Sequence, residues 1–235
     1  MERNSEDTPN YALHNLGTPA EGIPTCAKHS SGTPQRIGLF GGTFDPVHHG
    51  HLIIAQAALE CARLDRMLFI PSARPPHKGQ DVMFTAAARR RFLSLALRGN
   101  PQFAVSDLEM NRRGPSYTID TLREFKSILP PGADLFFLVG MDNLFEMETW
   151  KEPRGILDEC TVLVADRACP EDIEIPAWLA DRVQRIPTPV IAISSSNIRR
   201  RIREGVSIRY LVPEAVEEEI ARIFPHSVLP SSMSG

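Results

Sequence analysis

The chain has 235 residues, enough for one domain with a complete hydrophobic core. Its formal net charge of −3 gives no reason to expect nucleic acid as a partner, and its apolar runs are too short to span a membrane. Four cysteines without CxxC spacing and the lack of a signal-peptide pattern lead us to expect a reduced, cytoplasmic protein.

The N-terminal segment differs in composition from the rest of the chain. Residues 1–35 are rich in Ser, Thr, Pro, Gly and Asn and show neither helical nor alternating periodicity. We therefore expect a disordered extension over 1–35, a single domain over 36–228 and a short flexible tail over 229–235.

From residue 36 onward, short apolar runs alternate with helical patterns. Strands are predicted over 37–40, 67–71, 103–106, 135–139, 161–165 and 183–186. Helices are predicted over 51–64, 84–98, 117–129, 152–159, 195–204 and 213–224. Strands that are apolar along their length are typical of a parallel sheet covered on both faces, so we expect an α/β fold with a doubly wound, Rossmann-like parallel sheet. Ligands of such sheets bind beyond the strand C-termini, at a switch point.

The first predicted strand leads into the most informative segment, GGTFDPVHHGHL at 41–52. A strand, a glycine-rich turn and a helix place free N–H groups and a helix dipole where a phosphate can bind. Gly41 and Gly42 let the backbone approach an anion, because neither carries a Cβ. His48 and His51 lie three residues apart at the helix start, so both rings can point at the same ligand.

Two other interpretations of this segment are weighed against phosphate binding. The histidines could be incidental to an ordinary turn, or His48, His49 and His51 could ligate zinc. A zinc site is disfavoured because no Cys or carboxylate cluster nearby completes a coordination shell and adjacent histidines diverge in direction. Asp45 and Pro46 are interpreted as structural, an Asx-type turn followed by a fixed φ.

Two later segments add polar groups near the predicted switch point. Gly140 ends an apolar strand, and Asp142 follows it, where a carboxylate can accept hydrogen bonds from ribose hydroxyls or an adenine amino group. Residues 193–202, ISSSNIRRRI, place three hydroxyls and then arginines at a helix N-terminus, which predicts a second anion site. Because a Walker-type lysine motif is absent from the sequence, transfer of a terminal phosphoryl group is not favoured.

The run at 48–51 resembles the HxGH signature of a nucleotidyltransferase superfamily. Five further segments resemble one branch of it, the bacterial nicotinate-nucleotide adenylyltransferases, in the same order: a proline-stiffened loop over 70–78, the run 107–122, the strand end over 137–142, Trp150 with Lys151, and 193–202. Residues 205–213 resemble the C-terminal element of that family. The likeness covers nearly all of 36–224 and implies a nucleotidyltransferase-type fold. The departure at Asn197 and the third serine leaves the expected chemistry untouched.

The resemblance implies transfer of the adenylyl group of ATP to nicotinate mononucleotide, giving nicotinate adenine dinucleotide and pyrophosphate. The residues implied in catalysis are His48, His51, Arg199 and Lys78. The residues implied in ATP binding are Gly41, Gly42, Thr43, Phe44, His48, His51, Gly140, Asp142, Ser194, Ser195, Ser196 and Arg199. Those implied in mononucleotide binding are Thr85, Tyr117, Trp150 and Lys151. Mg²⁺ is expected to accompany ATP, held by phosphate oxygens and water rather than by protein side chains.

Several roles within these sets follow from the same likeness. His48 and His51 are expected at the α- and β-phosphate oxygens, with Arg199 at the β/γ end. Trp150 is expected against the pyridine ring, with the Lys151 backbone N–H at the ring carboxylate. Ser116 is predicted to cap the helix over 117–129.

Three competing functions are open at this point. A sister adenylyltransferase would act on pantetheine phosphate or nicotinamide mononucleotide; residues 116–122 and Trp150 favour a pyridine nucleotide. HIGH-type aminoacyl-tRNA synthetases share the histidine motif, but this chain lacks a KMSKS-like loop and is too short for tRNA-binding domains. The non-enzymatic alternative is a nucleotide sensor, which His48 and His51 together with Arg199 argue against. Small molecules are the expected partners, and the sequence predicts no oligomeric state.

Overall fold

The computed structural model describes residues 35–73, 82–167 and 175–224. The predicted N-terminal extension, apart from residue 35, and the predicted C-terminal tail lie outside these ranges, as does Lys78. In the part of the chain that is described, no helix combines the length and apolar character needed to cross a membrane.

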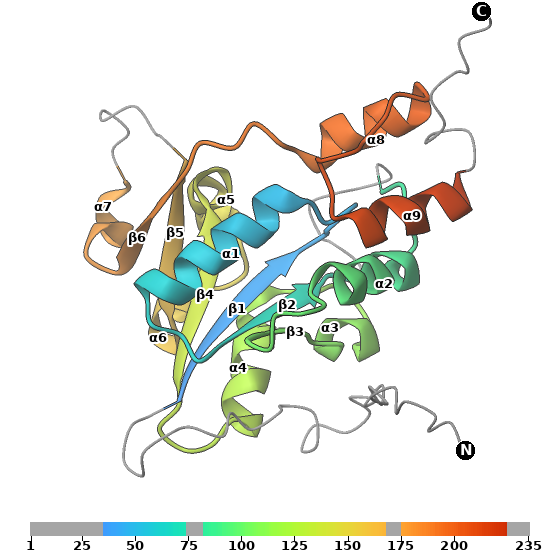
Figure 1. Ribbon diagram of the computed structural model, residues 1–235. Coiled ribbons are helices and arrows are strands. Elements are labelled where there is room, and N and C mark those ends of the chain that lie inside the picture. Colours follow the sequence, from blue (N-terminus) through green and yellow to red (C-terminus); the bar gives the residue numbers. More distant parts are fainter. Residues whose placement is uncertain (1–34, 74–81, 168–174, 225–235) are drawn as a thin grey trace, which may run out of the picture.

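Six parallel strands form a single sheet in the order β3-β2-β1-β4-β5-β6 (Figure 1). The strands are β1 (Arg36–Gly42), β2 (Arg66–Pro71), β3 (Phe103–Val105), β4 (Asp134–Gly140), β5 (Thr161–Arg167) and β6 (Val183–Thr188). Each overlaps a predicted strand, and every pairing in the sheet is parallel. This order is the doubly wound pattern, and its switch point lies between β1 and β4, where the chain leaves one half of the sheet for the other.

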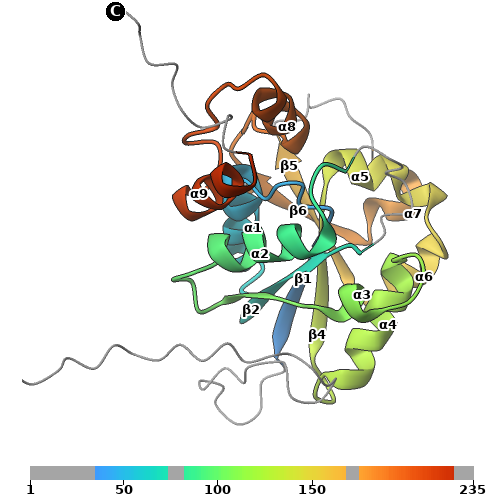
Figure 2. The same ribbon diagram turned by 90° about the vertical axis from the view of Figure 1, so that its right-hand side faces the viewer.

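Helices cover both faces of the sheet, as predicted (Figures 1 and 2). One face carries α1 (His49–Cys61), α2 (Ala86–Ala96), α8 (Ser195–Arg203) and α9 (Glu214–Ile223). The other carries α4 (Thr118–Ile128), α5 (Met141–Glu146), α6 (Pro153–Glu159) and α7 (Ala177–Ala180). Short helical pieces at α3 (Leu108–Asn111) and η1 (Met147–Thr149) complete the described elements.

Strand β4 shows why the sheet is buried on both sides. Leu135, Phe137 and Val139 pack into the core under α4 and α6. Phe136 and Leu138 pack into the core under α1 and α8. Since successive side chains of a strand point to opposite faces, a run of five apolar residues fills both cores at once.

Two local expectations are corrected. Ser116 does not cap α4, because Tyr117 occupies the N-cap position and Ser116 lies one residue before it, with only 8% of its surface exposed. Four short helical elements of three to six residues were not predicted: α3, α5, η1 and α7. Elements that short complete fewer than two turns, so no apolar periodicity can form in them.

The two described cysteines should differ sharply in reactivity. Burial raises the pKa of the Cys160 thiol to about 12, whereas Cys61 is exposed on α1. Since the thiolate is the reactive form, iodoacetamide at pH 8 should modify Cys61 in the native protein and Cys160 only after unfolding in urea. Mass spectrometry of the digested protein reads both sites, and native labelling of Cys160 at the rate of Cys61 would contradict the pKa assignment.

Candidate active site

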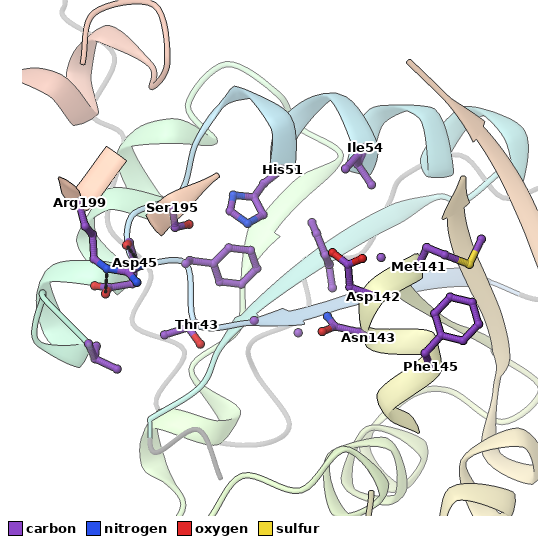
Figure 3. Close-up of a pocket in the computed structure, with 16 residues that line it drawn as sticks. Thr43, Asp45, His51, Ile54, Met141, Asp142, Asn143, Phe145, Ser195 and Arg199 are labelled. Atoms are coloured by element: carbon purple, nitrogen blue, oxygen red, sulfur yellow. Dashed lines mark hydrogen bonds and ion pairs between the residues drawn. The ribbon is translucent and has the colours of Figure 1, made fainter. Parts of the chain in front are cut away.

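A cavity of about 260 Å³ lies beyond the C-terminal ends of β1 and β4, at the switch point of the sheet (Figure 3). Its residues come from four parts of the chain that are far apart in sequence. They are Phe40, Gly41, Gly42, Thr43, Phe44, Asp45, His51, Ile54, Val82, Gly140, Met141, Asp142, Asn143, Phe145, Ser195 and Arg199. The glycine loop, the strand end at Gly140 and the serine–arginine helix, which the sequence placed in separate motifs, therefore share one cavity.

His51 lines this cavity and its ring points into it (Figure 3), whereas His48 is not among the lining residues. The two rings stack with centroids 3.7 Å apart, and His48 is only 2% exposed. The His48 backbone N–H donates to Nδ1 of His51 over 3.2 Å. A neutral His51 ring must then carry its proton on Nε2, where it can donate a hydrogen bond. We predicted that both rings point at one ligand. In the structure, His51 lines the cavity, and His48 stacks against the His51 ring without lining it.

Steric crowding explains why the third residue of the HxGH motif, Gly50, is a glycine. A Cβ built on Gly50 would lie 3.0 Å from two atoms of the His48 ring. Phe44 packs edge-on against the His51 ring, with ring centroids 5.1 Å apart. Phe44 has a φ of 50°, in the left-handed region that non-glycine residues rarely adopt. Backbone strain of this kind persists where packing holds it, and it often marks functional loops.

Asp45 holds the turn after β1 through contacts distant in sequence. Its carboxylate accepts hydrogen bonds from the N–H groups of Met83 and Phe84, at 2.8 and 2.9 Å. Arg199 donates to the Asp45 backbone oxygen over 3.0 Å, and its Nε lies 3.7 Å from the carboxylate. The structural role predicted for Asp45 is present, but these partners replace the local Asx-type turn that was expected.

The three serines at the start of α8 have different positions. Ser194 is the N-cap and accepts a hydrogen bond from the Asn197 N–H. Ser195 lines the cavity and donates to the Pro46 oxygen over 3.0 Å. Ser196 accepts from the Arg199 guanidinium over 3.2 Å. Ser195 and Arg199 therefore reach the cavity, while Ser194 and Ser196 organise the helix end that carries them.

Arg89 is a buried residue of this region that the sequence analysis missed. It is 1% exposed and donates to the backbone oxygens of Thr43 and Ser72, at 2.6 and 2.8 Å, which follow β1 and β2. Burial lowers the pKa of its guanidinium, and the charge of Asp45 opposes that shift. A signal was present, since Arg89 precedes Phe92 and Leu93 at the spacing of an apolar helix face. An arginine at a core position of a predicted helix indicates an anchor for backbone carbonyls.

A second cavity of about 160 Å³ adjoins the first and shares Gly41, Gly42, Thr43 and Asn143 with it. Tyr117, Trp150 and Lys151 line it, as three of the four residues expected around the mononucleotide. The fourth, Thr85, is placed elsewhere: it is the N-cap of α2, where its hydroxyl accepts a hydrogen bond from the Ala88 N–H. Thr118, which the sequence analysis did not select, lines the cavity together with Glu109, Ser116, Thr121 and Glu146.

The second cavity combines aromatic rings with charged groups. The Trp150 ring packs against Phe137, with centroids 6.3 Å apart. The Lys151 ammonium group lies 5.0 Å from the centre of the Tyr117 ring and pairs with Asp120 over 2.9 Å. Among the described residues, no oxygen accepts a hydrogen bond from the Lys151 backbone N–H. The rings offer stacking surface for a planar ligand, and the N–H is a donor available to an anion.

The sequence matches the cytidylyltransferase-like family model over residues 39–201. A protein of Thermomicrobium roseum named probable nicotinate-nucleotide adenylyltransferase is 46% identical over 198 residues, covering 80% of this chain and 90% of that protein. A protein of the same name from Thermus thermophilus is 46% identical over 190 residues, covering 80% of this chain and 97% of its own length.

Solved structures share the fold. Plasmodium falciparum nicotinic acid mononucleotide adenylyltransferase in complex with NaAD superimposes with a TM-score of 0.67 at 16% identity, covering 83% of this chain and 98% of that one. The same enzyme in complex with APC gives a TM-score of 0.66. At this level of identity, the likeness establishes the architecture alone.

Proposed function

This chain belongs to the nicotinate-nucleotide adenylyltransferases of the cytidylyltransferase-like family, and we propose that it transfers the adenylyl group of ATP to nicotinate mononucleotide. The products are nicotinate adenine dinucleotide and pyrophosphate, so the reaction is a step of NAD biosynthesis. The free thiols of the two described cysteines support our further proposal that it acts in the cytoplasm.

The observation that carries this proposal is the shared wall of the two cavities. Gly41, Gly42, Thr43 and Asn143 line both. The first cavity offers His51, Ser195 and Arg199 to phosphates, and the second offers aromatic rings to a planar base. Two substrates that each fill one cavity would meet over the glycine loop, where a backbone without Cβ atoms can approach a phosphate closely.

The chemistry asks for positioning and charge stabilisation rather than a strong base. A 5′-phosphate oxygen of the mononucleotide forms a bond to the α-phosphorus of ATP, and the bond from that phosphorus to the bridging oxygen of pyrophosphate breaks. The attacking phosphate is already an anion near neutral pH, because its second pKa is about 6. We assign His51, through its Nε2–H, to the oxygens on which charge grows as pyrophosphate leaves. Arg199 and Ser195 hold the departing end.

The residues of the first cavity fit a Mg²⁺ ion carried by the triphosphate. The described residues contain no cluster of three or more His, Cys, Asp or Glu side chains that could hold a metal. Asp45 is engaged by Met83, Phe84 and Arg199, which leaves Asp142 as the carboxylate available in this cavity. An ion held mostly by phosphate oxygens and water requires no more than that, and when bound it would offset part of the triphosphate charge.

The test is pyrophosphate release from ATP and Mg²⁺ with three acceptors in turn: nicotinate mononucleotide, nicotinamide mononucleotide and pantetheine phosphate. The proposal expects the largest kcat/KM with the nicotinate compound. A larger value with either other acceptor would assign the chain to a sister activity. Failure with all three, together with measurable ATP binding, would favour a nucleotide sensor.

The second cavity yields a prediction on substrate choice. Trp150→Ala should raise KM for nicotinate mononucleotide about tenfold or more, since it removes the ring surface for a cationic pyridinium. The native enzyme should prefer the nicotinate compound over the amide, because a backbone N–H binds a carboxylate about twice as strongly as a neutral oxygen. Steady-state kinetics with both mononucleotides measure the two effects.

Thr85→Ala is the matched comparison for this pocket. As a helix cap, Thr85 should affect the free energy of unfolding by about 1 kcal/mol when truncated, with KM for the mononucleotide unchanged. A rise in that KM would return Thr85 to the substrate site that the sequence suggested. Equal use of nicotinate and nicotinamide compounds by the native enzyme would overturn the pocket assignment.

A further inference from the structure

The second cavity contains a buried carboxylate that the proposed chemistry has not used. Glu109 lies on α3, lines the cavity and is only 6% exposed. Its Oε1 accepts a hydrogen bond from the Thr121 hydroxyl on α4 over 2.8 Å. Its Oε2 is closed off from solvent and accepts no hydrogen bond from the residues that the structure describes. One oxygen of a buried anion is therefore closed off from bulk solvent and has no donor among the residues that the structure describes.

The negative charge of Glu109 is not neutralised by the described charged residues around it. Arg112 reaches it only through Thr121, to whose hydroxyl it donates over 2.9 Å. The same guanidinium is ion-paired with Glu124. Glu109, Arg112 and Glu124 together carry one net negative charge. Within the described ranges, no cationic side chain forms an ion pair with the buried Glu109 carboxylate. A desolvated carboxylate is unfavourable unless positive charge lies nearby.

We propose that Glu109 is the counter-ion of the positively charged pyridinium ring of the mononucleotide, acting through space from the wall of the second cavity. This inference rests on the proposed function, which places that ring in the second cavity. A pyridine nitrogen bonded to ribose carries a permanent positive charge, and the faces of Trp150 and Tyr117 in the same cavity also attract cations. A charge shut away from water acts across a low dielectric and is little screened by salt.

The other charged groups of this cavity are less suited to that role. Glu146 also lines it but is exposed, so that water and salt weaken its field. The Lys151 ammonium is paired with Asp120, and together they are neutral. Glu109 is therefore a specificity residue: it should favour a cationic ring over a neutral ring of the same shape.

The experiment compares two mononucleotides that differ in ring charge: nicotinate mononucleotide and its 1,4-dihydropyridine form, whose ring is neutral. The native enzyme, Glu109→Gln and Glu109→Asp are measured with both. Glu109→Gln should lower the kcat/KM ratio of cationic to neutral substrate about tenfold, mainly through KM for the cationic compound. Glu109→Asp keeps the charge and should keep most of the ratio. KM for ATP should not change in either variant.

Glu124→Gln is the matched control, because it removes the same charge from a side chain of the same cluster that is 44% exposed. It should leave the ratio unchanged. A loss of activity toward both mononucleotides in equal proportion, with a lowered melting temperature, would make Glu109 a structural residue and overturn the inference. An unchanged ratio in a folded Glu109→Gln protein would overturn it as well.

A measurement on the native enzyme tests the inference should Glu109→Gln fail to fold. N-methylnicotinate and 3-methylbenzoate have the same shape and differ by the ring charge. The cationic compound should inhibit more strongly in competition with the mononucleotide, and equal inhibition would overturn the inference. Absence of transfer to any mononucleotide by the native enzyme would instead refute the proposed function, so the two failures are distinguishable.

Discussion

Replacement of His51 by alanine is expected to lower kcat about a hundredfold or more at saturating substrates, with little change in KM for ATP. His51 faces the first cavity and its Nδ1 accepts a hydrogen bond from the His48 backbone N–H, so a neutral ring carries its proton on Nε2. A donor that meets charge developing in the transition state is worth about 3 kcal/mol, and this appears in kcat rather than in substrate binding. Pyrophosphate release under saturating ATP and mononucleotide measures it.

Two neighbouring histidines sharpen this test. His49 precedes the motif glycine and does not line the cavity, so His49→Ala should retain near-native kcat. His48 stacks on the His51 ring, and His48→Ala should also lower kcat strongly, because the His51 ring would lose its support. A His51→Ala enzyme with near-normal turnover would remove His51 from the chemistry.

The longer helices and strands of this fold were predictable because their apolar patterns extend over enough residues to distinguish a helical from a strand period. The five apolar residues of β4 fill two cores and leave no ambiguity about a strand covered on both sides. The alternation of strands and helices predicted a doubly wound parallel sheet and limits its topologies to a few, while the strand order itself comes from the structure. The short helices α3 and α5 were not predictable, yet they carry Glu109 and Asp142 to the two cavities.

Within the site, groups contained in one short motif were easier to foresee than groups joined across the fold. The placement of Gly41, Gly42 and His51 at one cavity follows from local spacing in a strand–turn–helix segment. Arg89 lies on α2 and donates hydrogen bonds to the backbone oxygens of Thr43, after β1, and Ser72, after β2. No sequence motif predicts these contacts between separate elements. Phe44 has a left-handed backbone, and its ring packs against Phe40, His51 and Phe69, which are contacts that no local pattern predicts.

Asp45 is the residue for which local reasoning differed most from the structure, and it yields the largest expected effect on stability. Its carboxylate is 2% exposed, accepts two backbone N–H bonds and lies beside the Arg199 guanidinium. Asp45→Asn removes the charge, and the new amide NH₂ cannot accept from a second N–H. Breaking a buried ion pair from one side costs about 3–5 kcal/mol. In a domain of this size, that corresponds to a melting temperature lower by about 6–20 °C.

Asp134→Asn provides the control for this substitution, because it makes the same chemical change at the opposite end of the sheet. Asp134 pairs with Arg36 over 3.3 Å, and its side chain is 47% exposed. Exposed pairs contribute about 0–1 kcal/mol, so its melting temperature should stay within a few degrees of the native value. Calorimetry of both variants separates the two environments, and kcat should fall only in Asp45→Asn, where the Arg199 guanidinium at the cavity loses the negative charge beside its Nε. Equal melting temperatures for the two variants would mean that the Asp45 contacts contribute no more than a surface ion pair, and the long-range anchoring of the β1 loop would have to be assigned to Arg89 instead.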